Sequence, residues 1–273
     1  MKLVMKYAVI ASSKDNASMN IRDSLLEHYK FEQTEVKFRN EFIYSKGDLS
    51  IYTLSKELVV SEDIDKEIAA DYFIFISKHQ SKAKIPSLTV HSIGNWSMAD
   101  LGGRSNILVK SSAMFQRDLY RNLHRFCKID KYDIINEVTH HGPFLEKPAI
   151  FIEIGSTNEE WNDKDAGKII ATTIINTVIE EREKVEVAVG LGGLHTCNNF
   201  NKLIKNSKIA VAHFCPKHML QFLDSKMIEE AISKTIEPVK SILLDWKGLK
   251  QDKQRIVNVL DSMGLDYKRT SDF

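Results

Sequence analysis

The stretch Ala149-Ile150-Phe151-Ile152-Glu153-Ile154 indicates most clearly how this chain folds. A short, nearly continuous apolar run is typical of a central strand that is covered on both faces. The stretch Phe73-Ile74-Phe75-Ile76 has the same character. Runs of this kind alternate along the chain with segments of helical periodicity. That alternation predicts an α/β protein, a three-layer sandwich with a mostly parallel or mixed sheet.

The apolar runs and the helical patterns predict where the elements lie. A helix is expected to begin at Pro216, because proline suits the first turn of a helix. The stretch Ser156-Thr157-Asn158-Glu159 fits a capping box, and Gly264 is a usual helix stop. Residues 1–273 are expected to form one unit, and a subdivision would fall in the charged segment 126–133. Strands are expected at residues 7–11, 51–54, 72–76, 88–91, 107–109, 134–138, 149–154, 185–189, 209–213 and 242–244, and helices at 18–29, 112–126, 163–179 and 252–263.

The composition narrows the class of protein. The 273 residues are 43% hydrophobic and 27% charged, with a formal net charge of +1. That balance does not indicate a general nucleic-acid binder, so an RNA partner would need a local basic patch. The three cysteines include no CxxC pair, which favours a reducing compartment. With no stretch of membrane-spanning length, we expect a cytoplasmic monomer or small homo-oligomer, with neither DNA nor a membrane as partner.

Two histidine-bearing turns follow apolar strands. They are Thr139-His140-His141-Gly142-Pro143 and Gly190-Leu191-Gly192-Gly193-Leu194-His195. Histidine titrates near physiological pH and is the commonest metal ligand, and strand-end loops are where α/β folds build sites. Neighbours on a strand point to opposite faces, but Gly142-Pro143 favours a turn that would change this. The glycine-rich turn is neither a dinucleotide fingerprint nor a P-loop, so its amides better suit an oxyanion or a phosphate.

Further candidate residues lie at the ends of other strands. Glu153 interrupts an apolar strand, where a charge is costly unless it is paired, so we expect it to contact a metal or to orient a histidine. His79 and His91 are expected to join the same rim. Cys197 and Cys215 are better explained as small buried hydrophobes than as soft metal ligands. Because neither H-E-x-x-H nor G-x-S-x-G occurs, the chemistry favoured is water activated by histidine or by a histidine-bound metal.

In this order, the motifs resemble the archaeal and plant type of D-aminoacyl-tRNA deacylase, the D-tyrosyl-tRNA deacylase family. Each motif alone is weak, but the ordered set spans nearly the whole chain. The matching pieces are Ala17-Ser18-Met19-Asn20-Ile21, Ser77-Lys78-His79, Leu88-Thr89-Val90-His91 with Gly94-Asn95, Thr139-His140-His141-Gly142-Pro143, Phe151-Ile152-Glu153-Ile154-Gly155-Ser156-Thr157 with Glu160-Trp161, Val189-Gly190-Leu191-Gly192-Gly193-Leu194-His195, Pro216-Lys217 and Leu244-Asp245-Trp246-Lys247-Gly248.

The resemblance implies a carboxylic ester hydrolase that acts in chiral proofreading, a form of translation quality control. It would release free D-amino acid and tRNA, with zinc as cofactor and a fold similar to phosphorylase-like and peptidyl-tRNA hydrolase-like proteins. The reaction needs positioned water, an oxyanion donor and exclusion of L-substrates. We expect His140, His195 and Glu153 to hold or activate the water, directly or as zinc ligands. His79 is expected to be catalytic as well, and the expected substrate-binding residues are His91, His141, Gly192, Gly193, Lys217 and Lys247.

The tRNA is expected to bind through its phosphates, so its affinity should fall with salt. Candidate contacts are the helix face bearing Arg117, Arg121 and Arg125, and the residues Lys78, Lys82 and Lys84. Two rival functions stay open at this point. A metallopeptidase or nucleoside phosphorylase of similar fold would turn over peptides or nucleosides without acting on aminoacyl-tRNA. A non-catalytic tRNA- or nucleotide-binding module would bind tRNA without deacylating it under any metal condition.

Overall fold

The computed structural model describes residues 5–273 and builds them around two main sheets. The larger sheet has eight strands in the order β2-β3-β4-β1-β5-β10-β6-β9. Its central strands β1, β5 and β10 are parallel, β6 is antiparallel to β10, and β9 is parallel to β6. These strands are β1 (Tyr7–Ser12), β2 (Glu32–Phe38), β3 (Glu41–Lys46), β4 (Leu49–Leu54), β5 (Tyr72–Gln80), β6 (Ser87–His91), β9 (Asp133–Asn136) and β10 (Ala149–Ser156).

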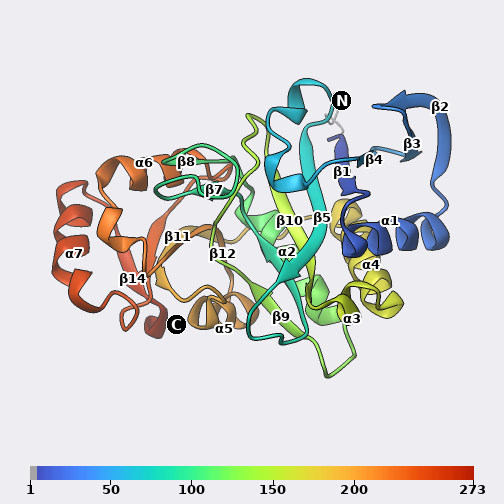
Figure 1. The fold of residues 1–273 in the computed structure, drawn as a ribbon. Helices are drawn as coiled ribbons and strands as arrows, with labels where there is room; N and C mark the ends of the chain where they lie inside the picture. The colour runs from blue at the N-terminus through green and yellow to red at the C-terminus, as the bar shows by residue number, and fades with distance from the viewer. Residues whose placement is uncertain (1–4) are drawn as a thin grey trace.

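The second sheet lies beside the larger one and contains the orange and red C-terminal strands in Figure 1. Its four strands run in the order β12-β11-β13-β14 and are all parallel. A short antiparallel pair, β7 (Gly94–Asn95) with β8 (Ile107–Leu108), forms a separate ribbon. The strands of the second sheet are β11 (Glu186–Gly193), β12 (Ile209–Pro216), β13 (Ser241–Leu244) and β14 (Tyr267–Arg269).

Side chains that alternate along the central strands fill two different cores. Ile74 and Ile152 pack with helices α1 and α4, whereas Phe75 and Phe151 face a core closed by loops and short 3₁₀ turns. Helix α2 contacts both α4 and β12 and so lies between the two sheets. The helices are α1 (Asn16–Tyr29), α2 (Ala113–Phe126), α3 (Asn158–Trp161), α4 (Lys164–Ile179), α5 (Asn198–Asn206), α6 (Ser225–Ser233) and α7 (Lys253–Ser262).

The α/β class and every predicted strand position are confirmed, but two local predictions are wrong. Pro216 ends strand β12 instead of starting a helix, and the next α-helix begins only after the cap residue Asp224. The capping box pairs Thr157 with Glu160 and starts the short α3, whereas α4 has its own cap, Asp163. A separate short helix therefore precedes α4, and a turn separates Pro216 from the next α-helix.

Backbone hydrogen bonds join the segment after β9 to the second sheet. The amide of Val138 donates to the carbonyl of His195 (3.0 Å), and that of Thr139 donates to the carbonyl of Phe214 (3.1 Å). The hydroxyl of Thr139 also lies 3.3 Å from Nδ1 of His213, which is fully buried in β12. The turn that follows is thereby fixed against both sheets.

None of the described helices is both long and apolar enough to cross a membrane. The three cysteines are all free.

Burial of His213 makes stability depend on pH. Burial lowers its pKa to about 4, against 6.5 for an ordinary histidine. Below pH 6.5 this histidine is protonated in the unfolded chain but stays neutral in the folded chain. Its contribution to the free energy of unfolding is therefore fully present above pH 6.5 and is lost as the pH falls towards 4. Between pH 7 and pH 5 we expect this one residue to account for a loss of about 2 kcal/mol.

The measurement is urea unfolding of the wild type and of His213→Asn at both pH values. The variant should lose about 2 kcal/mol less than the wild type on acidification. His28→Asn, which changes an exposed histidine, should behave like the wild type. The same pH dependence in all three proteins would contradict the assignment.

Candidate active site

Histidines from distant parts of the sequence gather in one cluster between the two sheets. The ring centroid of His140 lies 4.1 Å from that of His91, 4.4 Å from that of His141 and 4.9 Å from that of His195. His79 lies 6.1 Å from His195, again between ring centroids. The two histidine turns, which are far apart in the sequence, therefore meet.

The turn after Thr139 brings both of its histidines into the cluster. His141 has a left-handed backbone with a φ of 40°. Gly142 packs so tightly that a Cβ there would lie 2.2 Å from the amide nitrogen of Gly103 and 2.6 Å from the carbonyl oxygen of Val59. This turn is the reason that His140 and His141 do not point to opposite faces, as neighbours on a straight strand would.

Glu153 is positioned by the register of the larger sheet. It lies opposite Ser77 on β5 and opposite Thr89 on β6. The Ser77 hydroxyl donates to Oε1 of Glu153, and the Thr89 hydroxyl donates to Oε2 at 3.4 Å. The same Oε2 lies 3.7 Å from Nδ1 of His79 and 3.8 Å from Nε2 of His91. A charge in the middle of a buried strand thus has four polar neighbours.

A second buried carboxylate, Glu137, is not among the site residues predicted from the sequence. It follows β9, is fully buried, and has Oε1 at 3.1 Å from Nδ1 of His79 and 3.4 Å from Nε2 of His195. Neither contact has hydrogen-bond geometry, so both carboxylate oxygens lack a hydrogen-bond partner. The signal that could have revealed it is a glutamate inside the predicted strand 134–138, since a glutamate inside an apolar strand is also what marks Glu153.

The cluster divides into charged and neutral groups. Burial favours the neutral form of every member, but the nearby histidines outweigh it at Glu137 and Glu153 and hold the pKa of both carboxyls well below the usual range. At His79, contacts with these carboxylates outweigh burial and raise the pKa to about 10. At His141 burial prevails and lowers the pKa to about 4, and it lowers the pKa of His140 as well.

Backbone carbonyls fix the tautomer of three of the histidines. A carbonyl oxygen can only accept, so Nδ1 of His91, His140 and His141 carries a proton. Burial keeps His140 and His141 neutral, which leaves their Nε2 atoms a free lone pair, whereas contact with Glu153 outweighs burial at His91 and raises its pKa. Nε2 of His91 is buried without a hydrogen-bond partner. Histidines that bind metals are oriented in this way. The distances are 3.0 Å from His91 to Ser92 O, 2.7 Å from His140 to Val138 O and 2.6 Å from His141 to Gly142 O.

Among residues 5–273, three overlapping groups have potential ligand atoms within 4.8 Å of one another. The trio predicted from the sequence, His140, His195 and Glu153, is divided among these groups instead of forming one of them. Its role as a metal site therefore stays a prediction. The groups are His91 with His140 and His141, His79 with Glu137 and His195, and His91 with Glu137 and Glu153.

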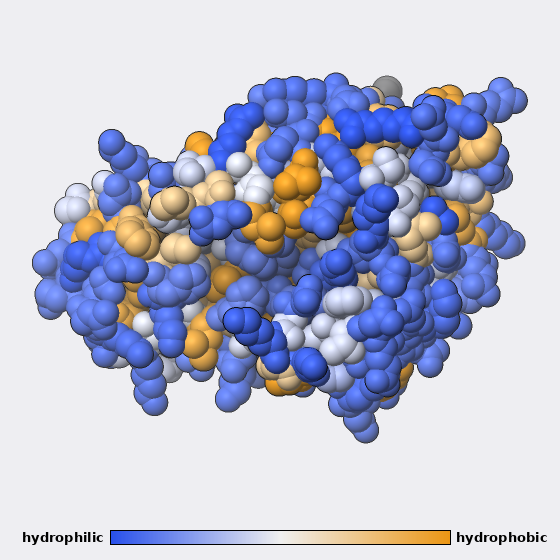
Figure 2. All heavy atoms as spheres, viewed as in Figure 1, coloured by the Kyte–Doolittle hydropathy of each residue, from blue (hydrophilic) through white to orange (hydrophobic). Residues whose placement is uncertain are grey.

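A cavity of about 430 Å³ opens onto the cluster and is lined by His79, His140, His141, His195 and Glu153, among others. His79 also lines a neighbouring groove of about 850 Å³, together with Glu137. The face shown in Figure 2 is hollowed near its centre. The site therefore offers a compact chamber and a longer groove that share one histidine.

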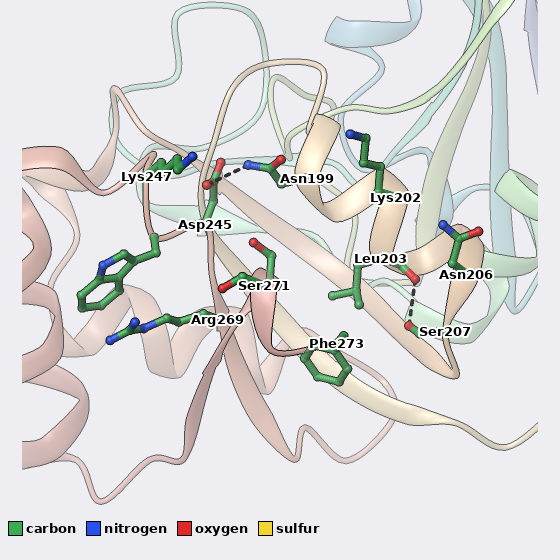
Figure 3. Close-up of a pocket in the computed structure, with 12 residues that line it drawn as sticks. Asn199, Lys202, Leu203, Asn206, Ser207, Asp245, Lys247, Arg269, Ser271 and Phe273 are labelled. Carbon is green, nitrogen blue, oxygen red and sulfur yellow. Dashed lines mark hydrogen bonds between the residues drawn. The ribbon is translucent and has the colours of Figure 1, made fainter.

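Four residues predicted to bind substrate lie elsewhere. Gly192 and Gly193 are buried in β11, and a side chain on Gly192 would meet Leu249. The amide of Lys217 donates to the carbonyl of Gly193 at 2.8 Å. Lys247 lines a separate pocket of about 470 Å³ near the end of the chain (Figure 3). None of the four is among the described residues that line the histidine cavity.

The arginines predicted to contact tRNA instead have partners within the protein. Arg117 is only 2% exposed and pairs with Glu183 at 3.2 Å. Arg125 pairs with Glu180 at 2.8 Å, and Arg121 donates to a backbone carbonyl of α5. The prediction that this helix face contacts tRNA is wrong for Arg117, which is buried, because helical spacing alone does not show which face packs against a neighbour.

Fold and site together define an α/β protein with a histidine–carboxylate centre of the kind that hydrolytic enzymes use. The sequence model of the D-aminoacyl-tRNA deacylase family matches residues 66–268. The D-aminoacyl-tRNA deacylase of Pyrococcus furiosus is 35% identical over 98% of this chain and 99% of its own, and that of Methanosarcina mazei is 34% identical over 98% and 93%. This chain belongs to the D-aminoacyl-tRNA deacylase family.

A solved structure supports the same fold. The crystal structure of a conserved protein of unknown function matches with a TM-score of 0.90 and 28% identity, covering 98% of this chain and 96% of that one. The resemblance indicated by the motifs is confirmed, and neither the peptidase and phosphorylase alternatives nor the non-catalytic module is favoured.

The packing of Gly142 leads to a prediction about the site. In Gly142→Ala the added methyl group would clash with backbone atoms, so the turn must shift and take His140 and His141 with it. We expect a loss of about 1–3 kcal/mol in unfolding free energy. NMR spectra should also show displaced imidazole signals for the clustered histidines.

Gly264→Ala provides the control. Gly264 has a φ of +65° but open space around it, so its variant should lose stability without moving the histidine signals. Unchanged imidazole signals in Gly142→Ala would show that this turn does not hold the cluster.

Proposed function

We propose that this chain hydrolyses the ester that joins a D-amino acid to the 3′ end of tRNA, releasing free D-amino acid and tRNA. The observation that carries the proposal is the cluster of histidines and buried carboxylates at the cavity, in a chain whose relatives are named D-aminoacyl-tRNA deacylases. The reaction would remove D-amino acids from tRNA during translation. Because charged tRNA is used in the cytoplasm, we infer a cytoplasmic protein.

Zinc is the proposed cofactor. The Nε2 atoms of His91, His140 and His141 suit one ion, which His91 would bind after losing its Nε2 proton, and His79, Glu137 and His195 would hold a second or an alternative one. The partnerless oxygens of Glu137 and the partnerless Nε2 of His91 support the proposal, since buried polar atoms normally have partners. Bound zinc supplies a Lewis acid, which lowers the pKa of water to about 7.

The protein residues would position the reactants. Glu153 is held by two hydroxyl groups and lines the cavity, so its carboxylate can orient a water molecule. The His195 side chain is 48% exposed, which leaves it within reach of an entering ester. An ester needs less leaving-group assistance than an amide. Catalysis therefore depends mainly on positioning the attacking water and on removing its proton.

The tRNA would be held largely through its phosphates. Lys82 and Lys84 are exposed in the loop that follows His79 and β5, and Lys78 lies half-buried with its amine 5.5 Å from the Trp161 ring centroid. These lysines remain candidate contacts, so tRNA affinity should fall as salt rises.

Deacylation of D-tyrosyl-tRNA by His140→Ala and His195→Ala tests the proposed function. Each variant should lose about 100-fold or more in rate, the typical effect of removing a group that handles a proton. His28→Ala, at an exposed position on α1, should retain the wild-type rate. L-tyrosyl-tRNA serves as the reference substrate. Full activity towards D-tyrosyl-tRNA in both cluster variants would contradict the site assignment.

Metal analysis tests the cofactor separately. The purified protein should contain zinc, and His91→Ala should contain less of it while His28→Ala keeps the full amount. Treatment with a chelator should abolish deacylation, and added zinc should restore it. A metal-free protein that retains full activity would contradict zinc as the cofactor and would indicate that the histidines activate water directly.

A further inference from the structure

The cavity at the histidine cluster has walls of two kinds. Leu58, Leu101 and Phe151 provide an apolar wall, whereas the carboxylate of Asp15 lies in the polar part of the lining. Asp15 is 8% exposed, so it is the most buried acid in this lining after Glu153, at 4%. A buried carboxylate beside an apolar surface suits a ligand that carries one positive charge and one apolar group.

Asp15 is held rigidly and close to the reactive cluster. Its Oδ1 accepts from the amide of Ser18 at 3.0 Å, and its Oδ2 accepts from the amide of Lys78 at 2.9 Å. The preceding residue, Ser77, donates its hydroxyl to Glu153. Adjacent residues of β5 therefore hold the two carboxylates, and each oxygen of Asp15 keeps a lone pair for a further donor.

The other charged groups of the lining are less suited to bind a cation. Glu57 is exposed, so water screens its charge. Lys14 is also exposed, and the amine of Lys78 lies over the Trp161 ring. Asp15 thus combines burial, a fixed orientation and a place beside the reaction centre.

We propose that this cavity is the aminoacyl subsite and that the Asp15 carboxylate binds the α-ammonium group of the D-aminoacyl ester. This inference rests on the proposed function, because it places the ester carbonyl at the histidine cluster. The side chain of the amino acid then packs on the apolar wall. The tRNA strand leaves through the larger groove, which shares His79 with the cavity.

Three separate anchors around one carbon explain chiral selection. The ammonium group is held at Asp15, the carbonyl at the histidine cluster and the side chain at the apolar wall. The enantiomer of a bound substrate can keep the first two contacts only by directing its side chain away from that wall, so the arrangement accepts one hand. Selection then follows from the shape of the cavity and needs no contact with the tRNA.

The test compares D-tyrosyl-tRNA with N-acetyl-D-tyrosyl-tRNA, in which acetylation of the amino nitrogen removes its positive charge. By kcat/KM, the wild type should prefer the free amine by about tenfold or more, the usual effect of leaving a buried charge unpaired. Asp15→Asn should cleave the two substrates at rates within about threefold of each other. A purely structural role for Asp15 would lower both rates and leave their ratio unchanged.

Asp15 is the N-cap of α1. Asparagine and serine also cap helices well, so Asp15→Asn and Asp15→Ser should fold, which thermal unfolding can verify. Asp224→Asn makes the same change at the cap of α6 and should keep the wild-type preference. A preference retained in both Asp15 variants, or absent from the wild type, overturns the subsite. A wild type that cleaves neither substrate overturns the proposed function and the subsite with it.

Discussion

Two carboxylates buried in the interior impose the main constraint on this structure. A buried charge without partners costs several kcal/mol, so Glu137 and Glu153 are tolerated only where cationic or hydrogen-bonding groups surround them. Their neighbours come from both sheets: His79 and His91 from the larger one, and His195 from the turn after β11. The two sheets must therefore pack together for the buried carboxylates to have partners.

The same constraint explains the division of the histidines. His79 lies between the carboxylates and is stabilised in its charged form, whereas His140 and His141 are kept neutral by burial. A site that places charged and neutral imidazoles within a few ångströms of each other offers both proton donors and free lone pairs. That combination suits hydrolysis better than binding alone, because hydrolysis needs a proton to be removed and returned.

The sequence predicts the central strands well, because a strand buried on both faces reads as an apolar run. It does not predict β2, whose residues are largely exposed and polar, or β3, which is only half-buried and has too short an apolar run to give that signal. The histidine turns are visible in the sequence, but Glu137 and Asp15 become recognisable only when the fold brings them to the cavity. Arg117 shows the converse, since its helical spacing suggests a tRNA contact but tertiary packing has buried its side chain.

The backbone bonds from Val138 and Thr139 to the second sheet have a consequence for folding. The clustered groups extend from His79 to His195, so a fragment must include both β5 and the turn after β11 to contain the complete centre. Contacts so distant in sequence form late, because the entropy of closing long loops must be overcome first. A ligand of this centre therefore binds only the folded protein. Its binding stabilises both sheets together.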